Sequence, residues 1–303
     1  MLSLLQWIFL LIIFLVVFLG ALIQYYEKSL PPFIPQLYRY GKFSYSGPAR
    51  LVTARVPKRW FVHFYVFSSI ISTLVLLLML WVYTRRESAP AAIQKFLDIF
   101  GGGSRKANVS ATSAFVAAIL CTMQCWKRFY ETSYVSVFSN STMDIGHYLL
   151  GYIHYFGVIV SLMIETPGFT HSPGKFDIAL NLKEVNYVFI IEAMIFLLFW
   201  WMQLDSAKIL ANLRKDKKGN VVTNKHLIPR GGLFEYVSSP HLFCEIMLYV
   251  TLGLILLGNS SFPFIIFWVV SNQVFSAVLT HQWYKSQFPD YPKDRKILVP
   301  LLF

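Results

Sequence analysis

Seven long apolar segments restrict what this chain can fold into more than any other feature. They cover residues 3–24, 61–83, 111–126, 145–165, 186–204, 242–258 and 262–280. A helix needs about 20 mostly apolar residues to cross a bilayer, and it satisfies its own backbone hydrogen bonds there. The sequence therefore predicts an all-α, polytopic membrane protein with seven transmembrane helices. Residues 258–261 alone separate the last two segments, which predicts a tight hairpin.

The composition supports a membrane protein and argues against several other classes. Hydrophobic residues make up 56% of the chain and charged residues only 14%, whereas soluble domains carry about 25% charged residues. Basic loops beside a membrane and an anionic cofactor explain the net charge of +12, so we predict no nucleic-acid partner. The three cysteines and seven histidines show no disulfide or metal-ligand spacing, and we predict no metal. The partners that we infer are lipids, with no obligatory protein partner.

Lysine and arginine residues are distributed unevenly between alternate loops. The loops on the side of the C-terminus hold 20 of them, and the loops on the opposite side hold seven. Positive residues are retained on the cytosolic side of a membrane. We therefore predict a cytosolic C-terminus and a lumenal N-terminus, with the first apolar segment acting as an uncleaved signal-anchor.

Three motifs near the C-terminus carry most of the chemistry that the sequence reveals. They are residues 228–240 (IPRGGLFEYVSSP), 281–284 (HQWY) and 290–296 (DYPKDRK). Over residues 203–303 the chain resembles the steroid 5α-reductase family, and its Tyr-Val-Ser-Ser-Pro step is similar to the polyprenol reductase branch. The resemblance implies an NADPH-dependent reductase of the endoplasmic reticulum membrane, which acts on a carbon–carbon double bond conjugated to a carbonyl. It also implies one integral-membrane domain over residues 1–303, with substrate-side helices within about 1–165 and an NADPH-binding half within about 186–303.

The resemblance also assigns residues to the cofactor site, and their chemistry suits NADPH. Guanidinium groups bind phosphate in bidentate fashion, and Glu245 can accept hydrogen bonds from the nicotinamide amide. His241 stands where the family usually has Asn, and Leu227 stands where it has Arg, so these contacts depart from the pattern. Arg295 is one of three cations in four positions, which fit either the 2′-phosphate of NADPH or anionic lipid. The predicted cofactor residues are Tyr40, Lys42, Gln203, Arg214, Tyr236, His241, Glu245, Tyr284 and Arg295.

The second apolar segment departs from the family at the position that binds the substrate carbonyl. Steroid reductases carry a Gln-Glu pair in this helix, and an ungapped match places Tyr65 and Val66 there. His63 shares a helical face with Val66, so it can supply the missing donor. Because neighbours two residues apart in a helix point about 200° apart, only one of His63 and Tyr65 can face the carbonyl directly. We predict these two residues as the catalytic candidates and favour His63. In the third segment, Cys125 stands where the steroid enzymes place a catalytic tyrosine.

The reaction itself limits the substrate. Hydride addition needs a carbonyl oxygen that accepts the displaced electrons, so we predict that the substrate is a polyprenal rather than the matching polyprenol. Reduction of its α-isoprene unit leads toward dolichol for protein N-glycosylation. The alternatives are a 3-oxo-Δ4-steroid 5α-reductase, a related sterol reductase, an isoprenyl-cysteine methyltransferase and a non-enzymatic scaffold. The missing Gln-Glu pair and tyrosine argue against the steroid enzyme.

Overall fold

The chain is built almost entirely from helices that run between two polar ends. The structure is a computed structural model, and it describes residues 1–31, 33–38, 54–139, 141–171 and 174–303. Tyr40 and Lys42, two predicted cofactor contacts, lie outside these ranges. The helices within them are α1 (Leu4–Tyr26), α2 (Phe33–Tyr38), α3 (Phe61–Arg85), α4 (Ala91–Gly101), α5 (Ala111–Tyr130), α6 (Ile145–Met163), α7 (Tyr187–Asn212), α8 (Pro240–Ile255) and α9 (Phe262–Gln287).

The predicted all-α, polytopic membrane fold is confirmed. Each of the seven predicted segments forms a helix, namely α1, α3, α5, α6, α7, α8 and α9. In the described part of the chain, five helical segments are long and apolar enough to cross a bilayer: Leu4–Ser29, Lys58–Arg85, Ile145–Met163, Tyr187–Asn212 and Phe262–Gln287. The helix α8 is shorter, with 16 residues, and α5 carries three polar or charged residues near its end. The number of seven membrane spans therefore stays a prediction.

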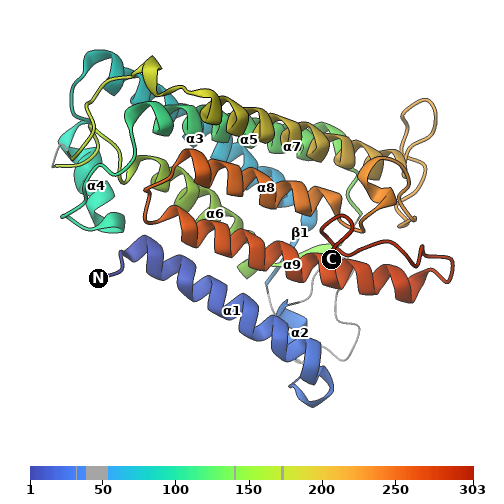
Figure 1. The fold of residues 1–303 in the computed structure, drawn as a ribbon. Helices are drawn as coiled ribbons and strands as arrows, with labels where there is room; N and C mark the ends of the chain where they lie inside the picture. The colour runs from blue at the N-terminus through green and yellow to red at the C-terminus, as the bar shows by residue number, and fades with distance from the viewer. Residues whose placement is uncertain (32, 39–53, 140, 172–173) are drawn as a thin grey trace.

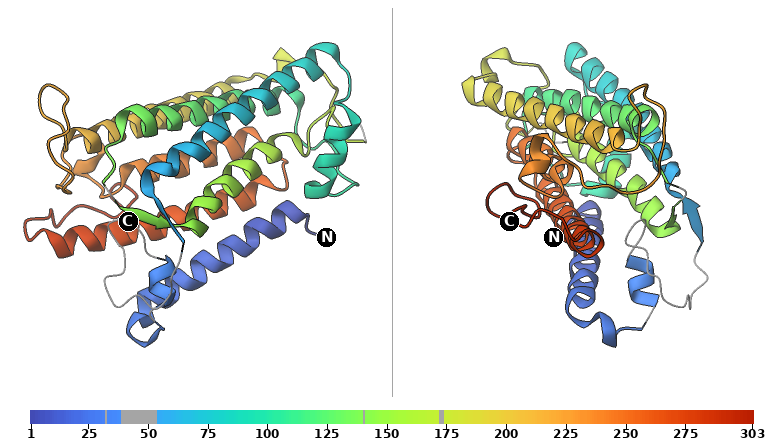
Figure 2. Two further views of the ribbon diagram at one scale, coloured as in Figure 1. Left: turned by 180° about the vertical axis from the view of Figure 1, so that it is seen from behind. Right: turned by 90° about the vertical axis from the view of Figure 1, so that its right-hand side faces the viewer.

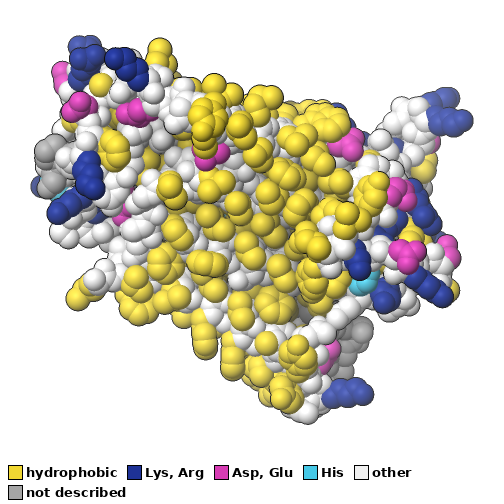
Figure 3. Space-filling view, viewed as in Figure 1, with side chains coloured by type: hydrophobic (Ala, Val, Ile, Leu, Met, Phe, Trp, Pro, Cys, Tyr) yellow, Lys and Arg dark blue, Asp and Glu magenta, His cyan; other side chains and the backbone are white. Residues whose placement is uncertain are grey.

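The long helices lie side by side and alternate in direction (Figures 1 and 2). Contacts link α1 to α9, α9 to α8, and α8 to α7, while α3 packs against α5 and α6. Helices from the first 165 residues thus pack directly on helices from the last 118, through the α1–α9 and α5–α8 pairs. A wide apolar belt covers the face in Figure 3, and Lys and Arg gather at its two ends. This distribution is the one expected of a bundle surrounded by lipid.

Local capping sets several helix ends. Ser3 and Gln6 form a capping box at the start of α1, and the Asn186 side chain accepts a hydrogen bond from the Phe189 amide at the start of α7. The predicted hairpin between α8 and α9 is confirmed. Gly258 turns the chain with φ of 104°, and the Asn259 side chain then accepts from the first amide of α9 at 2.9 Å.

Two elements were not predicted from the sequence. The helix α4 lies between the second and third predicted segments, in residues 84–110. Only one face of this helix is apolar, so a search for membrane-length apolar runs misses it. The strands β1 (Arg55–Pro57) and β2 (Thr142–Asp144) pair in antiparallel fashion, with Arg55 opposite Asp144 and Pro57 opposite Thr142. This small sheet fixes the starts of α3 and α6 at the same end of the bundle.

Candidate functional site

A first group of polar side chains lies between α7 and α8, inside the apolar bundle. Gln203 of α7 is 2% exposed, and its Nε2 donates to the carbonyl oxygen of His241 at 3.1 Å and to the carboxylate of Glu245. Gln124 of α5 joins this group, because its Nε2 donates to Gln203 Oε1 at 3.0 Å. Three predicted cofactor residues are thus brought together. A carboxylate is costly inside a membrane, and these amide donors stabilise Glu245.

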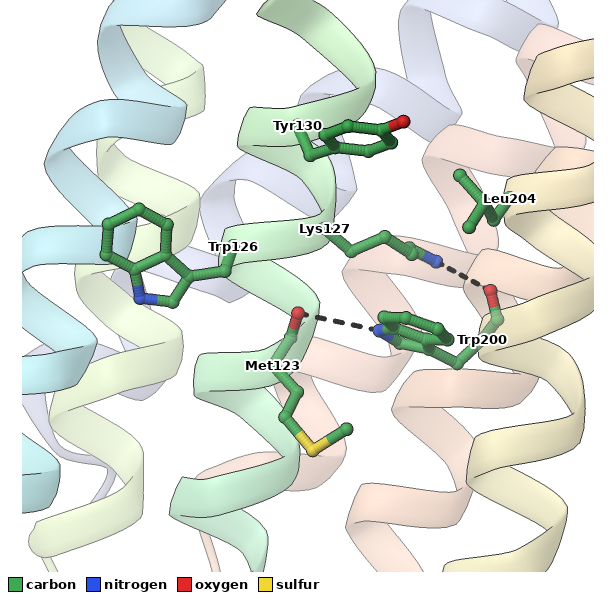
Figure 4. Close-up of a pocket in the computed structure, with 6 residues that line it drawn as sticks. All are labelled: Met123, Trp126, Lys127, Tyr130, Trp200 and Leu204. Atoms are coloured by element: carbon green, nitrogen blue, oxygen red, sulfur yellow. Dashed lines mark hydrogen bonds between the residues drawn. The ribbon is translucent and has the colours of Figure 1, made fainter. Parts of the chain in front are cut away.

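Lys127 of α5 brings a positive charge to the same group. Its Nζ donates to the Trp200 carbonyl oxygen at 3.1 Å and to Gln203 Oε1, and it lies 3.8 Å from the carboxylate of Glu131. Figure 4 shows the amine directed at the backbone of Trp200. An apolar surface groove of about 420 Å³ lies over this amine, lined by Met123, Trp126, Lys127, Tyr130, Trp200 and Leu204. The buried polar group therefore comes close to the outer wall of the bundle between α5 and α7.

Arg128, the next residue of α5, binds Tyr65 of α3. Its Nη2 donates to the Tyr65 hydroxyl at 2.8 Å, and its guanidinium lies 5.0 Å from the centre of the Tyr65 ring. Its Nη1 donates to the carboxylate of Glu131, which is buried. Arginine has only donors, so the contact with Tyr65 uses a lone pair of the phenol oxygen. The O–H proton of Tyr65 is therefore left for another acceptor.

His63 lies on a different face of α3 from Tyr65. It is exposed, its Nδ1 lies 3.1 Å from the hydroxyl of Tyr148, and its ring lies 5.3 Å from the ring of Trp60. Tyr65 is 7% exposed and faces the interior. The structure therefore brings Tyr65 to the buried polar residues and does not bring His63 there, opposite to the order that we expected from the sequence.

A further polar group joins α6, α8 and α9. Trp268 Nε1 donates to His154 Nδ1 at 3.1 Å, and His154 Nε2 lies 2.7 Å from the hydroxyl of Tyr249. The ring of Tyr155 lies 4.8 Å from that of His154 and 5.6 Å from that of Tyr65. This group is thus continuous with the Tyr65 side of the bundle.

Arg295 is a buried charge near the end of the chain. Its side chain is 3% exposed, and none of its three guanidinium nitrogens has a hydrogen-bond partner among the described residues. The guanidinium lies 5.2 Å from the ring centre of Tyr291, which in turn stacks on Tyr284 at 5.3 Å. Burying a charge without a partner costs several kcal/mol. This geometry is typical of a site that binds an anion.

Ser238 connects the three motifs that the sequence analysis singled out. Its Oγ lies 2.7 Å from His281 Nδ1 and 2.6 Å from the Tyr291 hydroxyl, and its backbone amide donates to the carbonyl oxygen of Lys296 at 2.9 Å. The motifs 228–240, 281–284 and 290–296 therefore form one structure next to the start of α8. The helix α8 also carries Glu245, so this structure and the buried polar group of Gln203 and Glu245 are joined by one helix.

The remaining predicted cofactor residues are less directly involved. Arg214 donates to the Val137 carbonyl oxygen and lies 3.0 Å from His226 Nδ1, so part of its hydrogen-bonding capacity is already used. Burial lowers the pKa of Arg214, and the neighbouring Tyr284 acts in the opposite direction. Tyr236 is 54% exposed, beside a turn in which Gly231 and Gly232 have φ of 89° and 53°.

The sequence analysis did not single out Gln124, Lys127, His154 or Tyr249 as site residues. A histidine inside an apolar segment was a usable signal, because the argument applied to His63 holds equally for His154. Tyr249 follows Glu245 by four residues and shares its helical face. In the part of the chain that the structure describes, no three His, Cys, Asp or Glu residues gather as metal ligands.

Comparison with known proteins adds independent information. A sequence model of the family described as 3-oxo-5-alpha-steroid 4-dehydrogenase matches residues 176–303. A polyprenal reductase of Drosophila melanogaster is 40% identical over 306 residues, which cover 99% of this chain and 93% of the relative. A polyprenal reductase of Homo sapiens is 34% identical, over 88% of this chain and 85% of the relative. A polyprenal reductase of Caenorhabditis elegans is 32% identical, over 88% of this chain and 86% of the relative.

Proposed function

The chain belongs to the steroid 5α-reductase family, in its polyprenal reductase branch, and from this premise we propose that it reduces a polyprenal. The double bond of the α-isoprene unit is the one conjugated to the aldehyde, so it is the bond that a hydride can attack. The product carries the saturated α-isoprene unit of dolichol, which protein N-glycosylation requires. The apolar belt and the membrane-length helices give a substrate of this kind direct access from the bilayer.

The observation that carries the cofactor assignment is that Arg295 is buried and its guanidinium has no hydrogen-bond partner among the described residues. An anion beside its guanidinium removes the cost of the isolated charge, and a phosphate can accept two parallel hydrogen bonds from it. We assign this position to a phosphate of NADPH rather than to a lipid headgroup, because Tyr284 and Tyr291 enclose it below the surface. Glu245 and Gln203 lie further along α8 and α7, and they suit the nicotinamide carboxamide, which has both donors and an acceptor.

The other predicted contacts extend this cofactor site. His241 and Tyr236 lie on either side of the start of α8, and Arg214 lies close to Tyr284. Tyr40 and Lys42, which lie outside the described residues, remain predicted phosphate contacts. When bound, NADPH supplies the hydride, and the residues of the chain position it and stabilise the charge that develops on the substrate.

The carbonyl oxygen of the substrate gains negative charge as the hydride arrives, and Tyr65 is the donor best placed to stabilise it. Arg128 occupies a lone pair of the Tyr65 oxygen, which polarises the phenol and leaves its proton for the substrate. Tyr65 is buried inside the bundle, where such a hydrogen bond is stronger than in water. An alcohol offers no oxygen that can accept the displaced electrons, so the aldehyde is the reactive form.

We place the enzyme in the endoplasmic reticulum membrane, with a lumenal N-terminus and a cytosolic C-terminus. The bias of 20 Lys and Arg against seven in alternate loops supports this orientation. Arg295 and the three C-terminal motifs then lie on the side of the cytosolic NADPH pool.

Purified protein in lipid nanodiscs can be given NADPH with a polyprenal, the matching polyprenol or a 3-oxo-Δ4-steroid, in parallel. We expect NADPH consumption with the polyprenal alone, and a product that is heavier by two hydrogen atoms. Reduction of the steroid in preference to the polyprenal, or no reduction of the polyprenal, would overturn the proposal.

A further inference from the structure

The buried chain Trp268–His154–Tyr249 determines which atoms carry protons. Indole nitrogen is only a donor, so the contact from Trp268 at 3.1 Å makes His154 Nδ1 an acceptor. The neutral imidazole then carries its proton on Nε2, which lies 2.7 Å from the Tyr249 oxygen and must donate to it. The Tyr249 hydroxyl therefore receives a hydrogen bond from His154 and keeps its own proton for a different acceptor.

Tyr249 lies in the part of the bundle where the reaction is proposed to take place. It is 3% exposed and follows Glu245 by one turn of α8, on the same face. Its partner His154 lies beside Tyr155, with ring centres 4.8 Å apart. The ring of Tyr155 lies 5.6 Å from that of Tyr65. His154 and Tyr155 thus connect the Tyr249 phenol of α8 to the Tyr65 phenol of α3 through neighbouring side chains.

We propose that Tyr249 is a second catalytic donor to the substrate carbonyl oxygen, and that His154 and Trp268 are its positioning residues. This inference rests on the proposed reduction of a polyprenal. Its structural basis is the fixed direction of the hydrogen bonds from α9 through α6 to α8.

The proton transfers balance as follows. Hydride forms a new bond to the β-carbon, the electron pair of the double bond moves toward the carbonyl oxygen, and the Tyr249 proton passes to that oxygen to give an enol. The phenolate left on Tyr249 is held by the Nε2–H of His154. Water then gives a proton to the α-carbon and leaves as hydroxide to the solvent, and the enol proton returns to Tyr249, which regenerates the phenol. The net uptake is one hydride and one proton from solvent.

The first test replaces Tyr249 by Phe. We expect turnover of polyprenal to fall about 100-fold, the effect of losing one oxyanion donor, with KM and NADPH affinity close to those of the wild type. Tyr83→Phe is the matched control, because Tyr83 is buried on α3 next to Phe115 and Phe169, outside this group. Wild-type turnover in Tyr249→Phe would overturn the inference. Absence of polyprenal reduction in the wild type would instead overturn the proposed function.

A second test uses the N–H of His154 and remains informative if Tyr249→Phe fails to fold. A glutamine amide can place an N–H near the position of His Nε2, so His154→Gln should retain most of the turnover that His154→Leu loses. Trp268→Phe removes the donor that fixes the tautomer of His154. Alone, this substitution should lower turnover at least tenfold, but it should have little further effect in the His154→Gln background. A purely structural role predicts that His154→Gln and His154→Leu are equally impaired and that Trp268→Phe acts alike in both backgrounds. That pattern would contradict the inference.

Discussion

Two arginines are buried to a similar degree, yet their surroundings differ completely. One follows α4 and the other lies in the tail after α9, and α4 and the end of α9 lie at opposite ends of the bundle (Figure 1). Arg105, beside α4, is 6% exposed, and it donates to the carbonyl oxygens of Ile164 at 2.8 Å and Phe169 at 2.9 Å, and to Asp98 at 2.6 Å. Arg295, near the C-terminus, is 3% exposed, and its guanidinium has no hydrogen-bond partner in the described ranges.

This contrast distinguishes a structural charge from a ligand-binding one. The guanidinium of Arg105 finds acceptors for its hydrogen bonds within the chain, so its buried charge is stabilised. These bonds fix the connection between α4 and the end of α6. Arg295 leaves its donors available, since no group in the described part of the chain accepts a hydrogen bond from them. Because an unpaired buried charge destabilises a fold, we propose that a ligand pairs with Arg295. Removal of each arginine should therefore affect different properties.

The largest expected effect is on the stability of the fold, at the end of the bundle that contains α4 and Arg105. Arg105→Met removes the donors, so Asp98 keeps only His171 as a partner among the described residues and the carbonyl oxygens of Ile164 and Phe169 lose their contacts with the guanidinium. We expect the free energy of unfolding to fall by about 3–5 kcal/mol, the usual result of breaking a buried ion pair. The thermal midpoint in detergent measures it, and Lys106→Met is the exposed neighbouring control. Equal midpoints for the two variants would contradict a structural role for Arg105.

The next largest effect is on catalysis, at Tyr65 in the interior of the bundle. Tyr65→Phe should lower the turnover of polyprenal by about 10²–10³, the scale for loss of an oxyanion donor, and leave NADPH affinity unchanged. His63→Gln should stay near wild type, because His63 contacts Tyr148 on the outer face of α3. Steady-state kinetics with both variants decides between them. If His63→Gln is inactive and Tyr65→Phe is active, the assignment from the structure is reversed.

The smallest effect is on the pH dependence of stability at the Arg105 end. Burial alone would raise the pKa of Asp98, but hydrogen bonds from His171 and Arg105 outweigh it, so the pKa is lowered. Because the folded pKa lies below the unfolded value, this contribution is complete above the ordinary Asp pKa of about 3.9 and is lost as the pH falls through the folded pKa. Thermal midpoints below about pH 4 should therefore fall more steeply in the wild type than in Asp98→Asn. If the thermal midpoints of the two proteins fall in parallel with pH, Asp98 does not contribute to the pH dependence of stability.

The sequence predicts the membrane helices well because length and apolar content are local properties. The seven predicted segments begin within three residues of α1, α3, α5, α6, α7, α8 and α9. The ends of α7 and α9 extend further, to Asn212 and Gln287, because polar residues continue these helices beyond the apolar segment. The helix α4 was missed because it contains polar residues as well as apolar ones and forms no long apolar segment.

The site depends more on tertiary structure than the helices do. Residues 203, 241 and 245 could be grouped through the family resemblance, and the structure brings them together. Helix geometry showed that only one of His63 and Tyr65 faces inward, but not which one. That choice is set by Arg128, which approaches from α5 and binds Tyr65. Likewise, no local pattern separates Arg105 from Arg295, because the difference among the described residues lies in Asp98 and the backbone carbonyl groups that accept hydrogen bonds from Arg105.

The most direct test of this account is calorimetric titration of NADPH into the wild type and Arg295→Met. We predict that the substitution weakens binding about 10- to 100-fold, as expected for loss of a charge-assisted contact with phosphate. The cofactor-free variant should melt no lower than the wild type, since it loses an unpaired charge. Unchanged NADPH affinity, or a midpoint that falls as it does in Arg105→Met, would contradict the assignment of Arg295 to the cofactor.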